Sequence, residues 1–443
     1  MKRGRQKREK SGLSAKGMLK EVKKSFEAVH VETSGKGRPR DITEIDCLMS
    51  AVAMFAMKSP SLLCFDRFVR GKPIVEHNLK TLYEVVQAPS DTRMREILDN
   101  VNPRDLRCGF LALFESVQRG QLLKDYQFLG SYLVAIDGTG AFESDKVHCA
   151  NCCEKHHRDG RISYYHNVLA GAIIHPNKKQ VIPLCPEPIF KHDGSVKNDC
   201  EQNAAHRFLE DLKAEHPRLK LTILSDALHA TAPHVNYLNS LDYHFILNIK
   251  PGSHSSLFEW VSGLKLETTT ITHGKNIYNF RFINSVPLNG TEESPEINFL
   301  ECKALEIDGK QTKERFFTWA TNHTITKKNI YDLMRAGRAR WKIENETFNT
   351  LKTQGYQFEH NFGHGKKNLN TVFAMLMFLA FLIDQVQEAA CGLFQAALAK
   401  SHARKYLWET MRVFFERIFI PSWEAFFLAI IGDKNVQLTF DST

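Results

Sequence analysis

The chain of 443 residues is long enough for two or three domains, each with its own hydrophobic core. Its composition, 43% hydrophobic and 25% charged, is that of a globular protein and excludes a mainly disordered or fibrous chain. The net charge of +9 is concentrated at one end, because residues 1–40 hold thirteen Lys and Arg against four Glu.

The first forty residues are predicted to form a basic, flexible arm that begins with Lys2, Arg3 and Arg5. A localised basic segment is typical of tails that bind polyanions, although a solvated terminus without a ligand has the same composition. The following residues, 41–127, show apolar side chains at helical spacing. Asp41 and Ser90 are candidate N-caps for two of the helices.

The ten cysteines are scattered apart from one cluster, and no apolar segment follows the basic N-terminus. This pattern predicts a soluble, cytoplasmic protein with free thiols. The longest apolar run, residues 373–383, is too short to span a bilayer and predicts a buried helix.

From Tyr132 onward the pattern changes to strands. The first strand contains Asp137 and is expected to stop at Gly138 and Gly140. Over residues 128–250 the predicted order is strand, strand, strand, helix, strand, helix, strand, which indicates a mixed α/β sheet covered by helices.

Residues 251–320 have alternating Thr-rich segments with NG and DG turn signals, which predict a β-rich insertion. Helices are expected again from Asn329. The predicted regions in chain order are the arm 1–40, a helical N-terminal region 41–127, a first core segment 128–250, the insertion 251–320, a second core segment 321–387 and a helical C-terminal region 388–443.

Three carboxylates stand out as candidate site residues. Asp137 and Asp226 each close a run of β-branched and aliphatic residues, and Glu344 lies on a helical segment. An isolated buried carboxylate is costly, so such residues need a partner. Carboxylates that hold two cations about 3.5–4 Å apart are the ligands of metal-dependent phosphoryl transfer, and hard oxygen ligands select Mg²⁺ or Mn²⁺.

Glu346 competes with Glu344 for the third position. Glu344 is preferred because it falls on a helical stripe that is predicted to point inward, whereas Glu346 points away from it. The stripe consists of Trp341, Glu344, Phe348 and Leu351. An ordinary helix ion pair between Arg340 and Glu344 also fits this spacing.

The segments around these carboxylates are AIDGTG, LSDALHA and RWKIENETFNTLK, accompanied by HCANCCEKHHRDG, YYHNVLAGAIIHP, VIPLCPEPI and KNDCEQNAAHRF. Together, over roughly 130–385, they resemble the DDE transposases of bacterial insertion sequences, in the group with a β-rich insertion before the glutamate. The resemblance implies an RNase H-like core, metal-dependent strand cleavage and transfer, and binding of transposon-end and target DNA. It also implies a homodimer on DNA, associated with the bacterial nucleoid.

In this resemblance Asp137, Asp226 and Glu344 are the catalytic metal ligands. Two positions depart from the family pattern: Gly337 stands where a Tyr precedes Arg340, and Lys352 follows Glu344 by eight residues instead of seven. The residues expected to contact DNA phosphates are Arg340, Lys352, Lys250, Lys2, Arg3 and Arg5.

A second cluster has the C-x2-C spacing of a zinc half-site, followed closely by histidines. The candidate ligands are Cys149, Cys152, His156 and His157. A loop with uncommitted thiols fits the same residues, and the sequence fixes no second half-site. Cys185, His192 and Cys200 are open candidates for completing it.

Four other polar residues have two interpretations each. Asp199 and Glu201 begin a predicted helix, where they either oppose its dipole or assist the metals. His166 and His229 lie near predicted strands, either as core residues or near a scissile phosphate. No Gly-rich phosphate loop is found, so no nucleotide cofactor is expected.

Two other functions remain open from the sequence. One is a DNA-binding protein of the same fold without activity. The other is a zinc-dependent phosphoesterase built around Cys149–His157.

Overall fold

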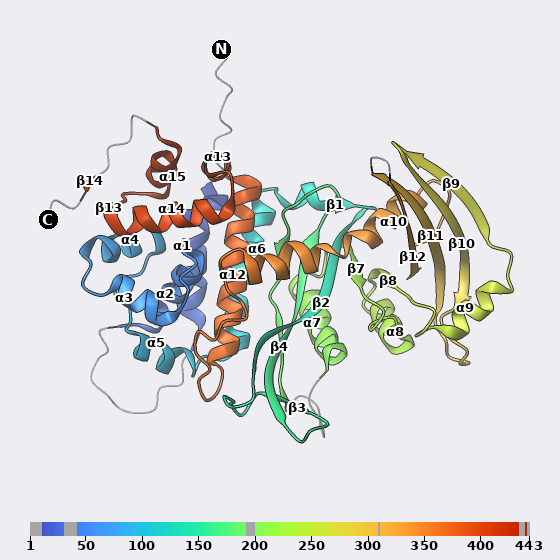
Figure 1. The fold of residues 1–443 in the computed structure, drawn as a ribbon, viewed down its shortest axis with the longest axis horizontal. Coiled ribbons are helices and arrows are strands. Elements are labelled where there is room, and N and C mark those ends of the chain that lie inside the picture. The colour runs from blue at the N-terminus through green and yellow to red at the C-terminus, as the bar shows by residue number, and fades with distance from the viewer. Residues whose placement is uncertain (1–10, 31–41, 192–199, 309–310, 434–438, 441–443) are drawn as a thin grey trace, which may run out of the picture.

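The computed structural model of the chain describes residues 11–30, 42–191, 200–308, 311–433 and 439–440 (Figure 1). Helices from both ends of the chain gather at one end of the molecule, a mixed sheet lies in the centre, and long strands of the insertion form the other end. Several residues considered above lie outside the described residues: Lys2, Arg3, Arg5, Asp41, His192 and Asp199.

Residues 15–25 of the predicted flexible arm form a packed helix, so that prediction is wrong for this stretch. Helix α1 (Ala15–Ser25) begins at Ser14, whose side chain accepts a hydrogen bond from the Gly17 N–H. Met18 and Val22 are fully buried, one turn apart on the same face, and α1 packs against α6. Lys16, Lys20 and Lys24 are exposed on the other face of this amphipathic helix.

The region 42–126 is helical, as predicted. Helix α2 (Glu44–Ala56) is capped by Thr43, whose side chain accepts from the Asp46 N–H, rather than by Asp41. Ser90 caps α5 (Asp91–Leu98) as predicted, accepting from the Arg93 N–H. The other helices of this region are α3 (Leu62–Val69), α4 (Pro73–Tyr83) and α6 (Arg107–Arg119).

The central strand is longer than the sequence suggested. β2 (Ser131–Ser144) continues through Gly138 and Gly140, where the sequence predicted its end. Both glycines pair with residues of the antiparallel strand β4 (Ile162–Ile174), and the register shifts only beyond Gly140. Asp137 therefore lies in the middle of a strand, because the long antiparallel pairing with β4 outweighs the weak strand propensity of glycine.

The sheet has mixed topology, in the order β3-β4-β2-β7-β8-β12-β11-β10-β9. β2, β7 and β8 run parallel, with β4 antiparallel at one side of them. The fold is therefore α/β, with helices α7 (Glu201–Glu215) and α8 (Ala232–Ser240) in the connections. The other strands of this region are β1 (Gln127–Phe128), β3 (Cys153–His156), β5 (Ile182–Pro183), β6 (Glu187–Ile189), β7 (Leu221–Ser225) and β8 (His244–Asn248).

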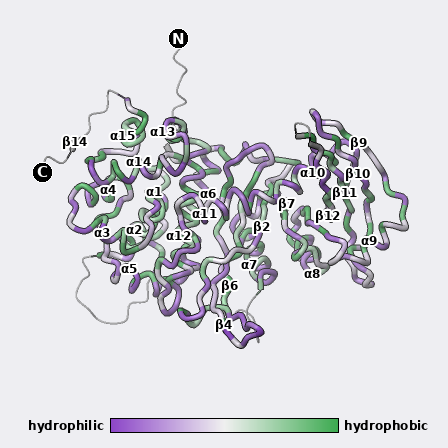
Figure 2. The backbone as a smooth tube through the Cα atoms, viewed as in Figure 1, coloured by the Kyte–Doolittle hydropathy of each residue, from purple (hydrophilic) through white to green (hydrophobic). Residues whose placement is uncertain are grey.

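The β-rich insertion extends the same sheet. Its last strand, β12 (Gln311–Thr321), pairs antiparallel with β8, so the strands of the core continue into those of the insertion. Hydrophilic and hydrophobic residues interleave along these strands (Figure 2), as expected for a sheet with one covered face. The other elements of the insertion are α9 (Ser255–Ser262), β9 (Glu267–His273), β10 (Asn276–Pro287) and β11 (Glu296–Asp308).

The C-terminal region returns to helices. Helix α12 (Leu369–Ala390) is long and apolar enough to cross a membrane, but its most apolar window is wholly buried in the protein. It packs against α2 and against β5 of the sheet, and is therefore a core helix. The other elements are α10 (Ile330–Ala339), a π-helical turn (Ile343–Phe348), α11 (Asn349–Thr353), α13 (Gly392–Ser401), α14 (Arg404–Arg417), β13 (Ile418–Phe419), α15 (Trp423–Ile431) and β14 (Thr439–Phe440).

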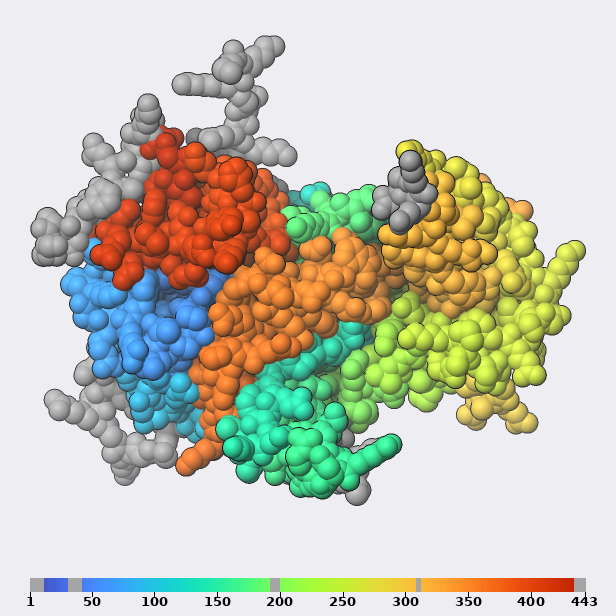
Figure 3. Space-filling model, in the orientation of Figure 1, coloured from blue at the N-terminus to red at the C-terminus, as the bar shows by residue number. Residues whose placement is uncertain are grey.

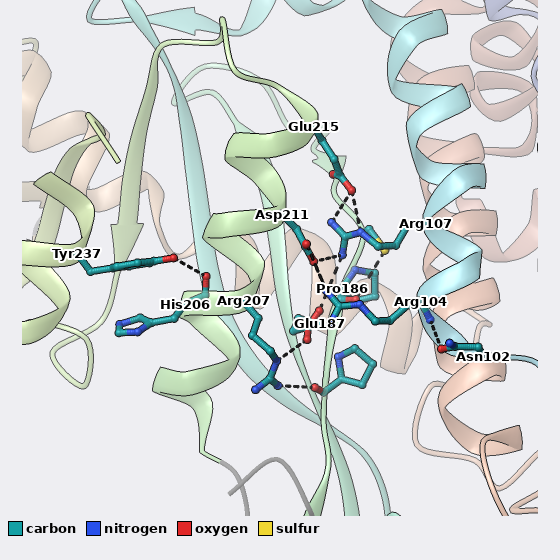
Figure 4. A network of polar contacts seen from close by, with 12 residues as sticks. Asn102, Arg104, Arg107, Pro186, Glu187, His206, Arg207, Asp211, Glu215 and Tyr237 are labelled. Carbon is teal, nitrogen blue, oxygen red and sulfur yellow. Dashed lines mark hydrogen bonds and ion pairs between the residues drawn. The ribbon is translucent and has the colours of Figure 1, made fainter. Parts of the chain in front are cut away.

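An ion network fastens α7 to the N-terminal helices (Figure 4). Arg107 of α6 contacts Asp211 at 3.1 Å and Glu215 at 2.7 Å, with its side chain only 13% exposed. On the inner side of α7, Arg207 contacts Glu187 of β6 at 2.7 Å. These contacts fix the helix whose first residue belongs to the site described next.

Candidate metal and phosphate site

Asp137 and Asp226 lie side by side at one edge of the parallel strands. β2 and β7 pair in parallel up to Ala135 and Leu224, and each aspartate lies two residues beyond this pair. Each carboxylate accepts a local backbone hydrogen bond at 3.0 Å, from Gly138 for Asp137 and from Leu228 for Asp226. The parallel pairing thus brings together two acids that are 89 residues apart in the sequence.

Glu344 joins them through Arg340. The guanidinium donates to Oδ2 of Asp137 at 3.1 Å and to Oε1 of Glu344 at 2.6 Å. One guanidinium therefore contacts two of the three predicted carboxylates. The segment 330–353 that carries both residues crosses the surface over the central strands (Figure 3).

Glu344 contacts Arg340, but it does not belong to an inward-facing stripe of the helix as the sequence predicted. The predicted inward stripe is wrong, because Trp341 is 44% exposed and the Glu344 side chain is 49% exposed, while Phe348 and Leu351 are buried. The chain forms a π-helical turn here, in which the Asn349 N–H donates to the Glu344 carbonyl. A π turn contains an extra residue, so positions before and after it no longer share one face.

This turn also bears on Lys352. One extra residue in a π turn places a side chain eight positions after Glu344 where the seventh would lie in a regular α-helix. In the structure Lys352 contacts Glu359 at 2.7 Å. Glu346 faces another region of the surface, beside Asn349 and Lys179.

The structure explains the glycine at position 337 and locates Lys250. Gly337 has no room for a side chain, because a Cβ there would lie 2.5 Å from Nε1 of the buried Trp319. This contact accounts for the missing tyrosine at that position. Lys250 is exposed just after β8, which is parallel to β7, and so lies at the same edge of the sheet as Asp226.

Two residues that the sequence left ambiguous belong to this site. Glu201, the first residue of α7, lies over Gly138, and His229 lies between Glu201 and Asp226. The Nδ1 and Nε2 atoms of His229 are 3.4 Å from Asp226 Oδ1 and 3.8 Å from Glu201 Oε1. The imidazole is 1% exposed, so its position is fixed by packing.

The electrostatics of the site indicate unbalanced negative charge. Burial raises the pKa of Asp137, and Asp226 and Glu344 add to this rise against the opposing effect of Arg340. Burial likewise raises the pKa of Glu201, while the imidazole of His229 chiefly lowers that of Asp226. Asp137, Asp226, Glu201 and Glu344 offer hard oxygen donors of the kind that Mg²⁺ or Mn²⁺ prefers.

The thiols of the C-x2-C motif meet two histidines, but not the two that were predicted. Cys149, Cys152, His166 and His364 offer ligand atoms that all lie within 4.8 Å of one another. His156 and His157 are directed elsewhere, toward Glu154 and Ser163 respectively. The candidates Cys185 and Cys200 are also absent from this group of described residues.

Comparisons of the sequence with protein-family models and with curated proteins give no match. The interpretation of the site therefore depends on its geometry.

The sequence left Glu201 open between opposing the helix dipole and assisting the metals, and only the position of α7 over Gly138 places it beside Asp137. The zinc-type role of His364 is what the sequence missed. His364 lies 198 residues from His166, and no local spacing connects them.

Proposed function

We propose that this chain is a DDE transposase that cleaves and transfers DNA strands at the ends of a mobile element. The observation that carries the proposal is the placement of Asp137 and Asp226 at the same end of paired parallel strands, with Arg340 in contact with both Asp137 and Glu344. Parallel β2, β7 and β8 beside antiparallel β4 support an RNase H-like core of the kind that the resemblance implies.

In this proposal the three carboxylates hold divalent cations, with Glu201 beside them. Bound Mg²⁺ or Mn²⁺ would activate the attacking oxygen and stabilise the leaving oxygen of a phosphodiester. Arg340 neutralises Asp137 and Glu344 when no cation is present, and becomes available to a phosphate when cations take over this role.

DNA would approach along the exposed edge that carries these acids. Lys250 supplies a positive charge at this edge, and the exposed Trp341 offers a ring on which a base can stack. The basic residues 1–40 add sequence-independent affinity for the backbone. A homodimer would bring two transposon ends together.

The experiment uses a supercoiled plasmid that carries the DNA flanking the reading frame, incubated with the full-length chain and Mg²⁺ or Mn²⁺. Asp137→Asn, Asp226→Asn and Glu344→Gln should each lower cleavage by on the order of 10³-fold, because a lost ligand removes several kcal/mol of charge stabilisation. Binding of the same DNA in a mobility-shift assay should persist.

Glu346→Gln is the matched control, since it changes a carboxylate on the same turn that faces away from the site. It should cleave within a few-fold of wild type. Cleavage that survives any of the three ligand substitutions would remove that residue from the site. DNA binding by wild type without metal-dependent cleavage would instead support a DNA-binding protein that has lost its activity.

A further inference from the structure

The second group of ligand-type residues is independent of the carboxylate site. Cys149 and Cys152 lie in the loop before β3, His166 lies on β4, and His364 lies in the loop between α11 and α12. Cys152, His166 and His364 are buried, with exposed fractions of 1%, 3% and 6%. Gathering a buried thiol, a half-buried thiol and two buried imidazoles in one place calls for a partner that suits all four.

The distances within this group match a tetrahedral ion. Two sulfurs that are each about 2.3 Å from a tetrahedral zinc ion lie about 3.8 Å apart. The sulfurs of Cys149 and Cys152 are 3.8 Å apart, too far for a disulfide bond. His166 Nε2 lies 3.3 Å from each sulfur, and His364 Nε2 lies 3.3 Å from that of Cys152.

The backbone around the thiols is already arranged for metal binding. The Cys149 N–H donates to the Cys152 sulfur at 3.4 Å, and the Cys152 N–H donates to the Cys149 carbonyl at 3.3 Å. Such a tight turn presents both sulfurs on one side. Among the described residues, Nδ1 of the buried His364 has no hydrogen-bond partner, so Nε2 is the atom that orients this ring.

We propose that Cys149, Cys152, His166 and His364 bind one structural Zn²⁺ ion. Four protein ligands fill the tetrahedron and leave no open position for a substrate, which argues against the zinc-dependent phosphoesterase. The ion also lies away from the carboxylates. Asp137 pairs with Ala170 of β4, and His166 lies four positions before Ala170 on the same strand. Four positions along a strand correspond to roughly 13 Å.

The zinc would join segments that are far apart in the sequence. Residue 364 belongs to the loop that follows the glutamate segment, and Asn151 already donates to the Lys367 carbonyl in this loop at 3.0 Å. Asp99 of the N-terminal region accepts hydrogen bonds from the N–H groups of Lys366 and Lys367. The ion would thus fasten the β2–β3 loop to the connection between α11 and α12.

The test measures metal in the full-length chain, purified without a metal-affinity step, in the absence of DNA. Elemental analysis should find about one zinc per chain, and Co²⁺ in its place should give the absorption of a tetrahedral site with thiolate ligands. Cys152→Ser and His364→Gln should each reduce bound zinc by about tenfold or more.

Cys64→Ser and His156→Gln are the matched controls, because both side chains are exposed and outside the group. They should keep the full zinc content. If the ligand variants fail to fold, the wild-type chain stripped with a chelator is titrated with Co²⁺ instead. Absence of Zn²⁺ and Co²⁺ binding by the reduced chain, or equal metal loss in His156→Gln and His364→Gln, would overturn the proposal.

Discussion

Gly138 and Gly140 lie two residues apart on β2, but only Gly138 is in contact with a candidate ligand. A Cβ added at Gly138 would lie 2.3 Å from Oε2 of Glu201, whereas at Gly140 the nearest atom is Oδ1 of Asn167 at 3.5 Å. Glycine at 138 therefore leaves room for the Glu201 carboxylate beside Asp137.

Gly138→Ala should push the Glu201 carboxylate away from the site. We expect Mn²⁺ binding, measured by titration calorimetry, to weaken by about tenfold, which is typical for loss of a residue that supports metal ligands. Gly140→Ala is the control and should bind Mn²⁺ like wild type, since its new methyl group makes an ordinary contact. Equal binding by the two variants would contradict a role for Glu201.

The raised pKa of Asp137 makes its ionised form a cost to folding. The folded-state pKa lies above the ordinary value of 3.8, so the folded chain binds more protons between these two pH values. Stability contributed by this group is therefore lost as the pH rises through that window.

Asp137→Asn should consequently raise the thermal unfolding midpoint at pH 8 by about 1–2 °C in the absence of divalent cations. The difference should shrink as the pH falls through the raised pKa of Asp137, because the wild-type carboxyl then takes up its proton. Calorimetry at several pH values checks this, and Mg²⁺ should raise the midpoint of wild type but not of the variant. If the advantage of Asp137→Asn over wild type were smaller at pH 8 than at pH 4, the raised pKa of Asp137 would be contradicted.

At the scale of elements, the position of α7 decides whether Glu201 reaches the site. Arg107 is mostly buried and contacts two acids of α7, Asp211 and Glu215 (Figure 4). Arg104 also contacts Asp211, at 3.0 Å, but its side chain is 55% exposed. The two arginines therefore differ in burial while sharing a partner.

Arg107→Met should lower the free energy of unfolding by about 2–4 kcal/mol, because it leaves the partly buried carboxylate of Glu215 without its cation. Arg104→Met should cost less than about 1 kcal/mol, as is usual for an exposed ion pair. Denaturant unfolding of both variants measures the difference. Similar losses for the two substitutions would mean that burial does not determine the strength of this network.

At the scale of the whole molecule, a buried lysine joins helices from both ends of the chain. Lys58 follows α2, is 0% exposed in its side chain, and contacts Asp384 of α12 at 2.6 Å. The Tyr356 hydroxyl donates to the same carboxylate. The ammonium also lies 4.0 Å from the ring centre of Tyr356 and 4.1 Å from that of Trp408 on α14.

Lys58→Met should destabilise the protein by about 3–5 kcal/mol, because Asp384 would remain buried without a cation. Lys72→Met is the control: Lys72 pairs with Glu416 between similar regions of the chain, but its side chain is 39% exposed. That variant should lose less than about 1 kcal/mol. Urea unfolding followed by fluorescence compares the two, and equal stability of Lys58→Met and wild type would contradict this account.

Local patterns were enough to predict many elements. The helices of 42–126, the strands before Asp226 and the β-rich insertion follow from periodicity and turn residues, because these signals act over a few neighbouring positions. Ser90 is a cap for the same reason. Where such signals competed with packing, the predictions failed: α1 is a buried helix and β2 continues through two glycines.

By itself the sequence singled out the acids Asp137, Asp226 and Glu344 and the thiols of a C-x2-C half-site. The tertiary structure alone decided what these residues meet. Parallel pairing of β2 with β7 places Asp137 beside Asp226, Arg340 links Glu344 to Asp137, and a distant loop brings His364 to the thiols. The longest of these contacts, from Cys149 to His364, joins residues 215 positions apart, and pairing at such distances depends on strand order and packing, which no local pattern encodes.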